Sequence, residues 1–310
     1  MKNYLLDTNC FYDISKGSTH DKKIQRKLNS IKESIVICPI VILEIVNCEP
    51  KNSDFVNRKR AMAALLNVKS EIYQDTPDDV ISKAFSQKPL QLDNKVDWGE
   101  IINTFLLANS YSEAKDGVLD YKNKRTLKLD FELINQWKQS FQEFFINSIQ
   151  ITNKEARQRV KDILSKYDLD KLTRKELSEL ILSNSLEGQN VYDYILSGLA
   201  VRAGIITEFE YEKLVDANDI TTIQEFIVRI KKTYNKTLET YLKVFIHYRR
   251  TLLKNSYSPE KNDIFDLDFF SYMDIFSNCF FVTSEKQWIE NYKTIIPDRV
   301  IKFEEFIKMI

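Results

Sequence analysis

The sequence predicts an α/β protein in which a parallel sheet flanked by helices is interrupted by a large all-α insertion. Two observations lead to this fold class. Short apolar segments alternate with helical segments near both ends of the 310-residue chain, which is the pattern of a parallel sheet with crossover helices. Only six glycines occur in the sequence, far below an average usage of roughly 7%. That scarcity disfavours a turn-rich all-β barrel.

The first part of the chain is expected to hold two main strands, each followed by a helix, and a weaker third strand. Tyr4 to Leu6 is a short apolar segment that ends in polar residues, and residues 34–38 (SIVIC) repeat this pattern. Pro39 is acceptable in a first helical turn, so we expect a helix from Pro39 to Val46. Also expected are a helix over 55–66, a weak third strand over 71–73, and a helix from Pro77 to Phe85 with Thr76 as its cap.

The last part of the chain continues the alternation. A helix beginning near Pro259 or Asn262 is expected to run to about residue 277, and the apolar segment 279–282 (CFFV) follows as a fourth strand. A helix around 288–293 and an edge strand over 299–303 complete the predicted elements.

The middle of the chain has a different character, because helical periodicity dominates it. We therefore expect a division into an N-terminal α/β part (1–87), a helical insertion (88–257) and a C-terminal α/β part (258–310). T-x-x-E capping boxes begin at Thr152, Thr173 and Thr207. The predicted helices of the insertion are 98–109, 129–149, 154–167, 174–184, 192–203, 208–215 and 223–253.

Composition limits the function classes. The chain has 45 basic and 45 acidic residues, so a polyanion would have to bind a local basic surface. No pair of cysteines has C-x-x-C spacing, and no run of about 18 apolar residues occurs. We expect a reduced, cytoplasmic protein without a signal peptide or a membrane span. The absence of a glycine-rich phosphate loop or dinucleotide motif argues against ATP and NAD.

Carboxylates lie near the predicted carboxyl edge of the sheet, where open parallel sheets bind ligands. Asp7 follows the first strand, and Glu44 lies in the helix after the second. Asp266 lies in the helix before the fourth strand, and Glu285 follows that strand. Like charges gathered at one edge raise each other's pKa, and a divalent cation relieves this repulsion. Hard oxygen ligands select Mg²⁺ or Mn²⁺, so the sequence predicts a metal site.

Each acid also has a structural explanation. An isolated helical glutamate such as Glu44 is usually exposed, but its apolar neighbours indicate a buried helix in which a carboxylate needs a partner or an ion. Asp7 could simply cap the first helix. Asp263 suits the first turn of its helix, whereas Asp266 lies among phenylalanines and fits that explanation less well. Glu285 is the weakest of these acids, because glutamate at a helix start is common.

Together these segments resemble the PIN domain, a family of nucleases with a parallel sheet and an acidic site at its carboxyl edge. The residues that carry the resemblance are LLDTN at 5–9, the Pro-led helix with Glu44, NDIFDLDFF at 262–270 and FFVTSEKQW at 280–288. Their order and spacing carry it, since each motif is short. The matching segments cover under half of the chain.

The resemblance implies specific roles. Asp7, Glu44 and Asp266 would be the main Mg²⁺ or Mn²⁺ ligands, with Asp263 as a possible additional one. Thr8 and Asn9 would steady the first carboxylate, and Thr283 would play the matching role at the fourth strand. The sequence departs from the family at the fourth acid, because Glu285 stands where T-x-D is usual, and this weakens a second metal position or makes it water-mediated.

Two functions therefore stay open. One is metal-dependent RNA hydrolysis by the acidic site, in a toxin of a toxin–antitoxin pair or a defence nuclease. The other is a PIN-like scaffold without catalysis that binds RNA or protein, which the altered fourth acid favours. RNA, an antitoxin or other inhibitor protein, and a second copy of the chain are the expected partners.

A basic stretch in the last predicted helix of the insertion is a second candidate site. We hypothesise that Arg249, Arg250 and Lys254 bind RNA backbone while interleaved aromatic residues stack on unpaired bases. The alternative, which is slightly favoured, is a solvated helix face whose aromatic residues pack in the core. The other members of the stretch are Arg229, Lys231, Lys232, Lys236, Lys243 and His247, with Tyr234, Tyr241, Phe245, Tyr248 and Tyr257 between them.

Overall fold

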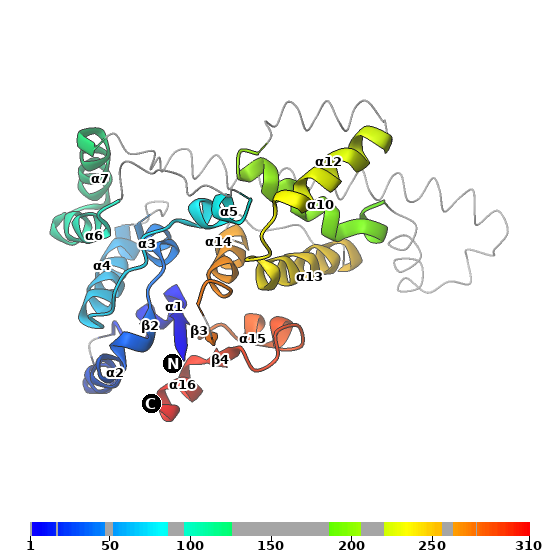
Figure 1. Ribbon diagram of the computed structural model, residues 1–310. Coiled ribbons are helices and arrows are strands. Elements are labelled where there is room, and N and C mark those ends of the chain that lie inside the picture. Colours follow the sequence, from blue (N-terminus) through cyan, green and yellow to red (C-terminus); the bar gives the residue numbers. More distant parts are fainter. Residues whose placement is uncertain are drawn as a thin grey trace. The chain divides into compact units, whose positions relative to one another are not determined.

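The computed structural model describes residues 2–16, 18–46, 52–85, 96–125, 186–205, 220–255, 263–276 and 278–310. The chain divides into two units (Figure 1). Unit 1 comprises Met1–Lys83, Lys88–Phe131 and Asp268–Ile310, and unit 2 comprises Ala84–Gln87 and Glu132–Leu267.

The centre of unit 1 is a four-stranded sheet in which every pair of neighbours is parallel, in the order β2-β1-β3-β4. In its middle, Leu5 of β1 lies opposite Val36 of β2 and Phe281 of β3. The predicted α/β class with a parallel sheet is therefore confirmed. The strands are β1 (Asn3–Leu6), β2 (Ile35–Val36), β3 (Cys279–Thr283) and β4 (Val300–Lys302).

The weak strand predicted over 71–73 is not a full strand. Ile72 forms an isolated parallel bridge with Ile37, and the Tyr73 N–H donates to the Ile37 carbonyl at 2.9 Å. Because β2 itself has only two residues, it offers no longer edge on which a further strand could pair.

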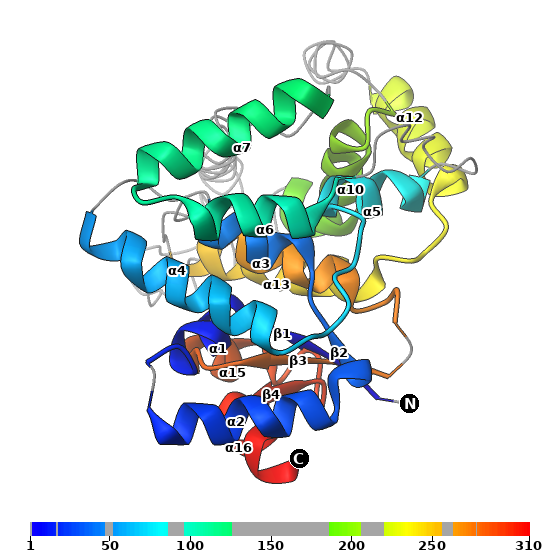
Figure 2. The same cartoon turned by 90° about the vertical axis from the view of Figure 1, so that its left-hand side faces the viewer.

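Helices surround this sheet. Figure 2 shows α2 and α16 on one side of it and α3 and α4 on the other. Helices α2, α7 and α16 were not anticipated, although Ser18 and Asp21 form a capping box at the start of α2. The helices of unit 1 are α1 (Thr8–Asp13), α2 (Thr19–Ser30), α3 (Pro39–Val46), α4 (Asn52–Asn67), α6 (Trp98–Leu107), α7 (Tyr111–Arg125), α15 (Lys286–Tyr292) and α16 (Phe303–Met309), with short 3-10 helices at Lys32–Ser34 and Phe270–Tyr272.

Two helices cross the boundary between the units along the chain. They are α5 (Pro77–Phe85) and α14 (Asp263–Phe269). The predicted bounds of α5 are confirmed, and Thr76 caps it as expected. The Asp79 N–H donates to the Thr76 hydroxyl oxygen, and the Thr76 N–H and hydroxyl both donate to the Asp79 carboxylate. The predicted helix up to residue 277 is shorter, since α14 ends at Phe269 and a 3-10 turn follows.

Aromatic side chains pack the segment before β3 against the sheet. The Phe281 ring lies 5.6 Å from Phe269 and 5.1 Å from Phe270, and Phe270 also contacts Tyr292 of α15 at 5.4 Å. Phe269, Phe270 and Phe281 are all at most 3% exposed. This burial fixes β3, and with it the residues that follow the strand.

Unit 2 is helical in the part that the structure describes. Its helices α12 and α13 both pack on α10. The long helix expected over 223–253 is wrong, because the chain breaks between α12 and α13, where Lys236 has a φ of 65° and the Asn235 side chain accepts hydrogen bonds from Thr237. The helices are α10 (Leu186–Arg202), α12 (Ile220–Thr233) and α13 (Glu239–Asn255).

The bounds of the two units differ from those of the predicted segments in the region of α6 and α7, which belongs to unit 1. These helices were assigned to the insertion, but α6 packs on α3 and α4, and the Trp98 indole N–H donates to the Gln74 carbonyl at 3.3 Å within unit 1. Trp98, Ile101 and Phe105 are buried there. The predicted helices over 129–149, 154–167, 174–184 and 208–215, and the capping boxes at Thr152, Thr173 and Thr207, lie outside the described residues.

None of the helices in the described ranges combines the length and the apolar character that crossing a lipid bilayer requires.

Candidate functional site

Asp7 lies at the carboxyl end of β1 and is only 4% exposed. Its N–H donates to the Val282 carbonyl of β3 at 2.9 Å, which continues the sheet by one residue. The Thr283 hydroxyl donates to Asp7 Oδ2 at 2.6 Å, and the Asn9 amide donates to the same oxygen at 3.3 Å. Both side-chain hydrogen bonds therefore converge on Oδ2, and within the described residues none reaches Oδ1.

The capping explanation for Asp7 holds only in part, because the main-chain N–H groups of Thr8 and Asn9 lower the pKa of its carboxyl less than Thr283 does. Asp7 occupies the N-cap position of α1, yet its carboxylate makes no capping hydrogen bond. Burial raises the pKa of this carboxyl above its ordinary value, and the hydrogen bond from Thr283 is the largest influence that lowers it again. A buried carboxylate of this kind is stabilised in its charged form by a nearby cation.

Glu44 is the only residue of α3 that is not buried; its seven helical neighbours are. This confirms the expectation of a buried helix with one acid. The Thr8 hydroxyl donates a short hydrogen bond to Glu44 Oε2. Thr8 was expected to steady Asp7, and its main-chain N–H does lower the pKa of that carboxyl, while its hydroxyl serves the second acid. Because Thr8 follows Asp7 directly, the two carboxylates belong to one polar network.

Arg58 of α4 holds the end of α3 and was missed by the sequence analysis. Its Nη1 donates to the main-chain carbonyls of Glu44 and Ile45, both at 2.9 Å, and its Nε bonds Asp54 at 2.9 Å. The last carbonyls of a helix have no partner inside the helix, so an arginine from a neighbouring helix stabilises this end. No spacing rule links Arg58 to Glu44, since only the packing of α4 brings them together.

The residues after β3 extend the network. The Glu285 N–H donates to Thr283 Oγ1 at 3.0 Å, so the Thr283 hydroxyl accepts from Glu285 and donates to Asp7. The Ser284 hydroxyl donates to Asp13 Oδ2 at 2.5 Å. Asp13, the last residue of α1, was not identified from the sequence, and it also pairs with Lys16 at 3.5 Å.

Asp263 and Asp266 lie in the part of α14 that belongs to unit 2. Both are partly buried, and Asp263 Oδ2 accepts a hydrogen bond from the Tyr248 hydroxyl at 2.5 Å. Asp268, two residues after Asp266 in α14, is fully buried and belongs to unit 1. The convergence of Asp266 and Asp263 with Asp7 and Glu44 stays a prediction.

The acidic network has the chemistry of a divalent-cation site, because it presents carboxylate and hydroxyl oxygens without histidine or thiolate ligands. Protein hydrogen bonds fix one oxygen of Asp7 and one of Glu44, as outer hydrogen bonds do for metal-binding carboxylates. In the part of the chain that the structure describes, no three His, Cys, Asp or Glu side chains lie close enough together to hold one ion. The third ligand is therefore not defined.

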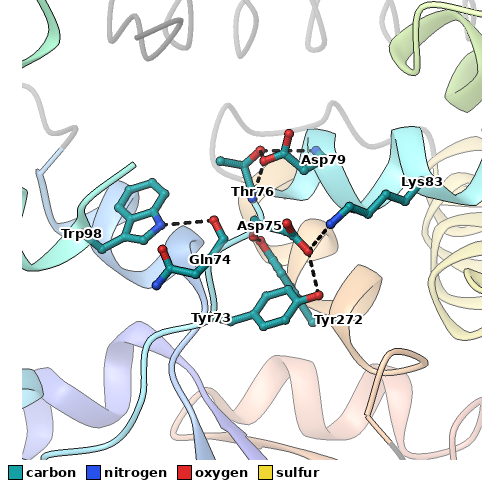
Figure 3. A network of polar contacts seen from close by, with 8 residues as sticks. All are labelled: Tyr73, Gln74, Asp75, Thr76, Asp79, Lys83, Trp98 and Tyr272. Atoms are coloured by element: carbon teal, nitrogen blue, oxygen red, sulfur yellow. Dashed lines mark hydrogen bonds and ion pairs between the residues drawn. The ribbon is translucent and has the colours of Figure 1, made fainter. Parts of the chain in front are cut away.

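A second polar network in unit 1 is structural (Figure 3). Asp75 Oδ2 accepts from the Tyr73 hydroxyl at 2.8 Å and pairs with Lys83 at 2.6 Å, and the Asp75 carbonyl accepts from Tyr272 at 3.0 Å. Burial, followed by the bond to Asp75, raises the pKa of Tyr73. These bonds tie the chain after the Ile72 bridge to α5.

The basic stretch differs from its expected form. Arg249 is fully buried, so it is not a surface contact for RNA, whereas Arg250 is exposed. The side chain of Lys254 lies outside the described residues, as does Tyr257. The aromatic residues pack inward, since Tyr234, Tyr241 and Phe245 are at most 8% exposed. The alternative of a packed helix with core aromatics is correct for these three.

A signal for the burial of Arg249 was present in the sequence. Leu242, Phe245, Arg249 and Leu252 follow the 3–4–3 spacing of one helical face, and all four are buried in α13. Arg250 lies seven residues after Lys243 on the other side.

Comparisons with known proteins give no relative from which a role could be transferred: no family model, curated protein or solved structure matches this chain.

Proposed function

We propose that this protein is a Mg²⁺- or Mn²⁺-dependent ribonuclease that hydrolyses phosphodiester bonds at the carboxyl edge of the unit 1 sheet. The observation that carries the proposal is the hydrogen-bonded pair of acids, Asp7 and Glu44, each held at one oxygen by a neighbouring hydroxyl. The PIN-like order of the sequence motifs supports the same chemistry.

Asp7 and Glu44 would hold the metal, and we expect Asp266, with Asp263 and Glu285 as further acids, to complete its ligands. A metal ion in such a site supplies an acidified water and stabilises charge on the scissile phosphate. Thr283 and Thr8 orient the two carboxylates, so these are preorganised before substrate binds. Burial raises the pKa of Asp7 and so disfavours its charged form, and a cation beside the carboxylate would favour that form again.

The second candidate function is that of a scaffold without catalysis. The observation that favours it is Glu285, whose longer side chain stands where the family usually has aspartate, on a residue whose side chain makes no capping hydrogen bond to α15. In that case the same edge would bind RNA or a partner protein without cleaving RNA.

RNA cleavage by the purified full-length chain separates the two. We expect cleavage that requires Mg²⁺ or Mn²⁺ and that Asp7→Asn lowers by at least about 100-fold, because loss of a metal ligand removes several kcal/mol of transition-state stabilisation. Asp79→Asn is the matched control, since its carboxylate accepts hydrogen bonds from Thr76 at the start of α5 and an asparagine amide oxygen can accept them too. Metal-independent cleavage, or equal activity of the two variants, would contradict the nuclease.

The resemblance also suggests a setting: a cytoplasmic toxin or defence nuclease that an antitoxin or other inhibitor protein holds inactive, as a monomer or homodimer. Expression of the wild-type chain should then arrest growth, and Asp7→Asn should not. Growth arrest by both chains would remove this setting and leave the enzymatic proposal to the cleavage assay.

A further inference from the structure

Helices α12 and α13 form the most basic part of the described chain. Residues 220–255 contain eight lysines and arginines but only two acids, Glu225 and Glu239, which gives a formal charge of +6 in a protein with no net charge. The uneven distribution means that unit 2 carries a local positive field that the whole chain does not.

Some of these cations serve the fold. Arg249 is buried, and Lys231 forms an ion pair with the buried Asp193 at 2.6 Å. The cations Lys232, Lys236, Lys243 and Arg250 are exposed and take part in no hydrogen bond or ion pair among the described residues.

The exposed cations follow the helical repeat of α13. Lys243 and Arg250 are seven residues apart, so they share a face and lie roughly 10 Å apart along the axis. The buried residues Leu242, Phe245 and Leu252 form the opposite side. Lys232 and Lys236 bring further positive charge to the end of α12 and the turn before α13.

Among the described side chains of α12 and α13, no aromatic ring is classed as exposed. Aromatic side chains stack on splayed bases in most single-strand binding sites. Here Tyr234, Tyr241 and Phe245 are buried, and the Tyr248 hydroxyl is bonded to Asp263. The exposed cations that remain are suited to contacting phosphates, and such contacts carry no sequence information.

We infer that Lys232, Lys236, Lys243 and Arg250 form a backbone-binding surface for double-helical RNA, independent of base sequence. The inference rests on the proposed function, since it names the form of RNA that the nuclease would meet. A duplex carries twice the phosphate density of one strand along its axis, so a surface of exposed cations without stacking groups favours it. Val228 is the single large apolar side chain exposed in the described part of α12 and α13, too little for insertion into a membrane.

Binding measured without metal tests the inference independently of cleavage. The full chain is titrated in EDTA with a labelled RNA duplex of about 20 base pairs, long enough for one protein footprint, and with one of its strands alone. Lys243→Glu/Arg250→Glu is compared with the control Lys22→Glu/Arg26→Glu, which makes the same charge change at exposed positions of α2. Lys243→Gln/Arg250→Gln replaces the first variant if that variant fails to fold.

We expect the α13 variant to bind the duplex at least about tenfold more weakly and to lower the salt dependence by about two released counterions. The α2 control should retain most of the affinity, and the single strand should bind more weakly than the duplex. Equal losses in both variants, unchanged affinity of the α13 variant, or tighter binding to the single strand would each overturn the inference. Retention on anionic vesicles with no RNA binding would overturn it too. Duplex binding without cleavage would leave the inference standing and refute the nuclease.

Discussion

The carboxyl edge of the unit 1 sheet and the α12–α13 surface of unit 2 hold charge in opposite ways. At the sheet edge, Asp7 is buried, and hydroxyl groups hold one oxygen each of Asp7 and Glu44. On α13, Lys243 and Arg250 project into solvent. The first arrangement fixes geometry at a cost in desolvation, and the second attracts polyanions without fixing geometry. Under the proposed function, the first arrangement would serve the chemistry and the second would serve substrate capture.

The same contrast exists within a single dipeptide. Arg249 is fully buried and Arg250 is exposed, although they are adjacent residues of the same type. The charge pattern of a sequence therefore does not define a binding surface until the buried face of the helix is known.

The largest effect should come from reversing the buried member of that pair. We expect Arg249→Glu to lower the free energy of unfolding by about 3 kcal/mol or more, because it places an opposite charge where the buried guanidinium was. Arg250→Glu, at an exposed position, should change it by about 0.5 kcal/mol or less. Urea denaturation followed by circular dichroism measures both. Similar stabilities of the two variants would contradict the burial of Arg249.

A smaller loss is expected at the acidic edge. Thr283→Val keeps the side-chain shape but removes the donor to Asp7 and the acceptor for the Glu285 N–H, which should cost about 1–3 kcal/mol. It should also raise the pKa of Asp7 further, since the lost hydrogen bond lowers it. Thermal unfolding is the measurement, and Thr294→Val at an exposed position is the control. A Thr283→Val protein as stable as the control would mean that this bond contributes nothing.

Substitutions of the neighbouring residues Lys231 and Lys232 at the end of α12 should differ modestly in their effect on the free energy of unfolding. Lys231→Met breaks the ion pair with the buried Asp193 and should lower stability by about 1 kcal/mol, whereas Lys232→Met should leave it unchanged. The free energies of unfolding in urea compare them directly. If the order is reversed, Lys232 rather than Lys231 serves the fold.

The smallest expected change is a gain in thermal stability, in the variant Asp7→Asn. Because burial raises the folded-state pKa of Asp7 above its ordinary 3.8, the folded protein binds more protons than the unfolded one between these two values, and its stability falls as pH rises through that window. Asp7→Asn lacks this loss, so its melting temperature should exceed that of the metal-free wild type at pH 7. Calorimetry should show the difference shrinking on acidification below 3.8 and Mg²⁺ raising only the wild type. A lower melting temperature for Asp7→Asn at pH 7 would show that the charge is not unfavourable.

The sequence was most informative where local chemistry and topology agree. The Pro39 start of α3 and the Thr76 cap of α5 are local signals, and both helices have the expected bounds. Asp7 and Glu44 could be assigned to one edge because parallel strands place their carboxyl ends together.

Other features depend on packing that no local pattern encodes. Arg58 reaches Glu44 only through the placement of α4, and Asp13 meets Ser284 only because β3 lies beside β1. The break after α12 had a local signal, the Asn235 turn, but helical periodicity on both sides concealed it. The roles of Asp266 and Asp263 depend on how the chain returns from unit 2, which spacing alone does not fix.

Consecutive residues serve the two acids: residue 7 supplies one carboxylate, and residue 8 holds the other. While the Thr8–Glu44 hydrogen bond is present, the peptide bond between residues 7 and 8 limits the separation of the Asp7 and Glu44 carboxylates. A shift of α3 relative to β1 would therefore have to stretch or break the hydrogen bond between the Thr8 hydroxyl and Glu44.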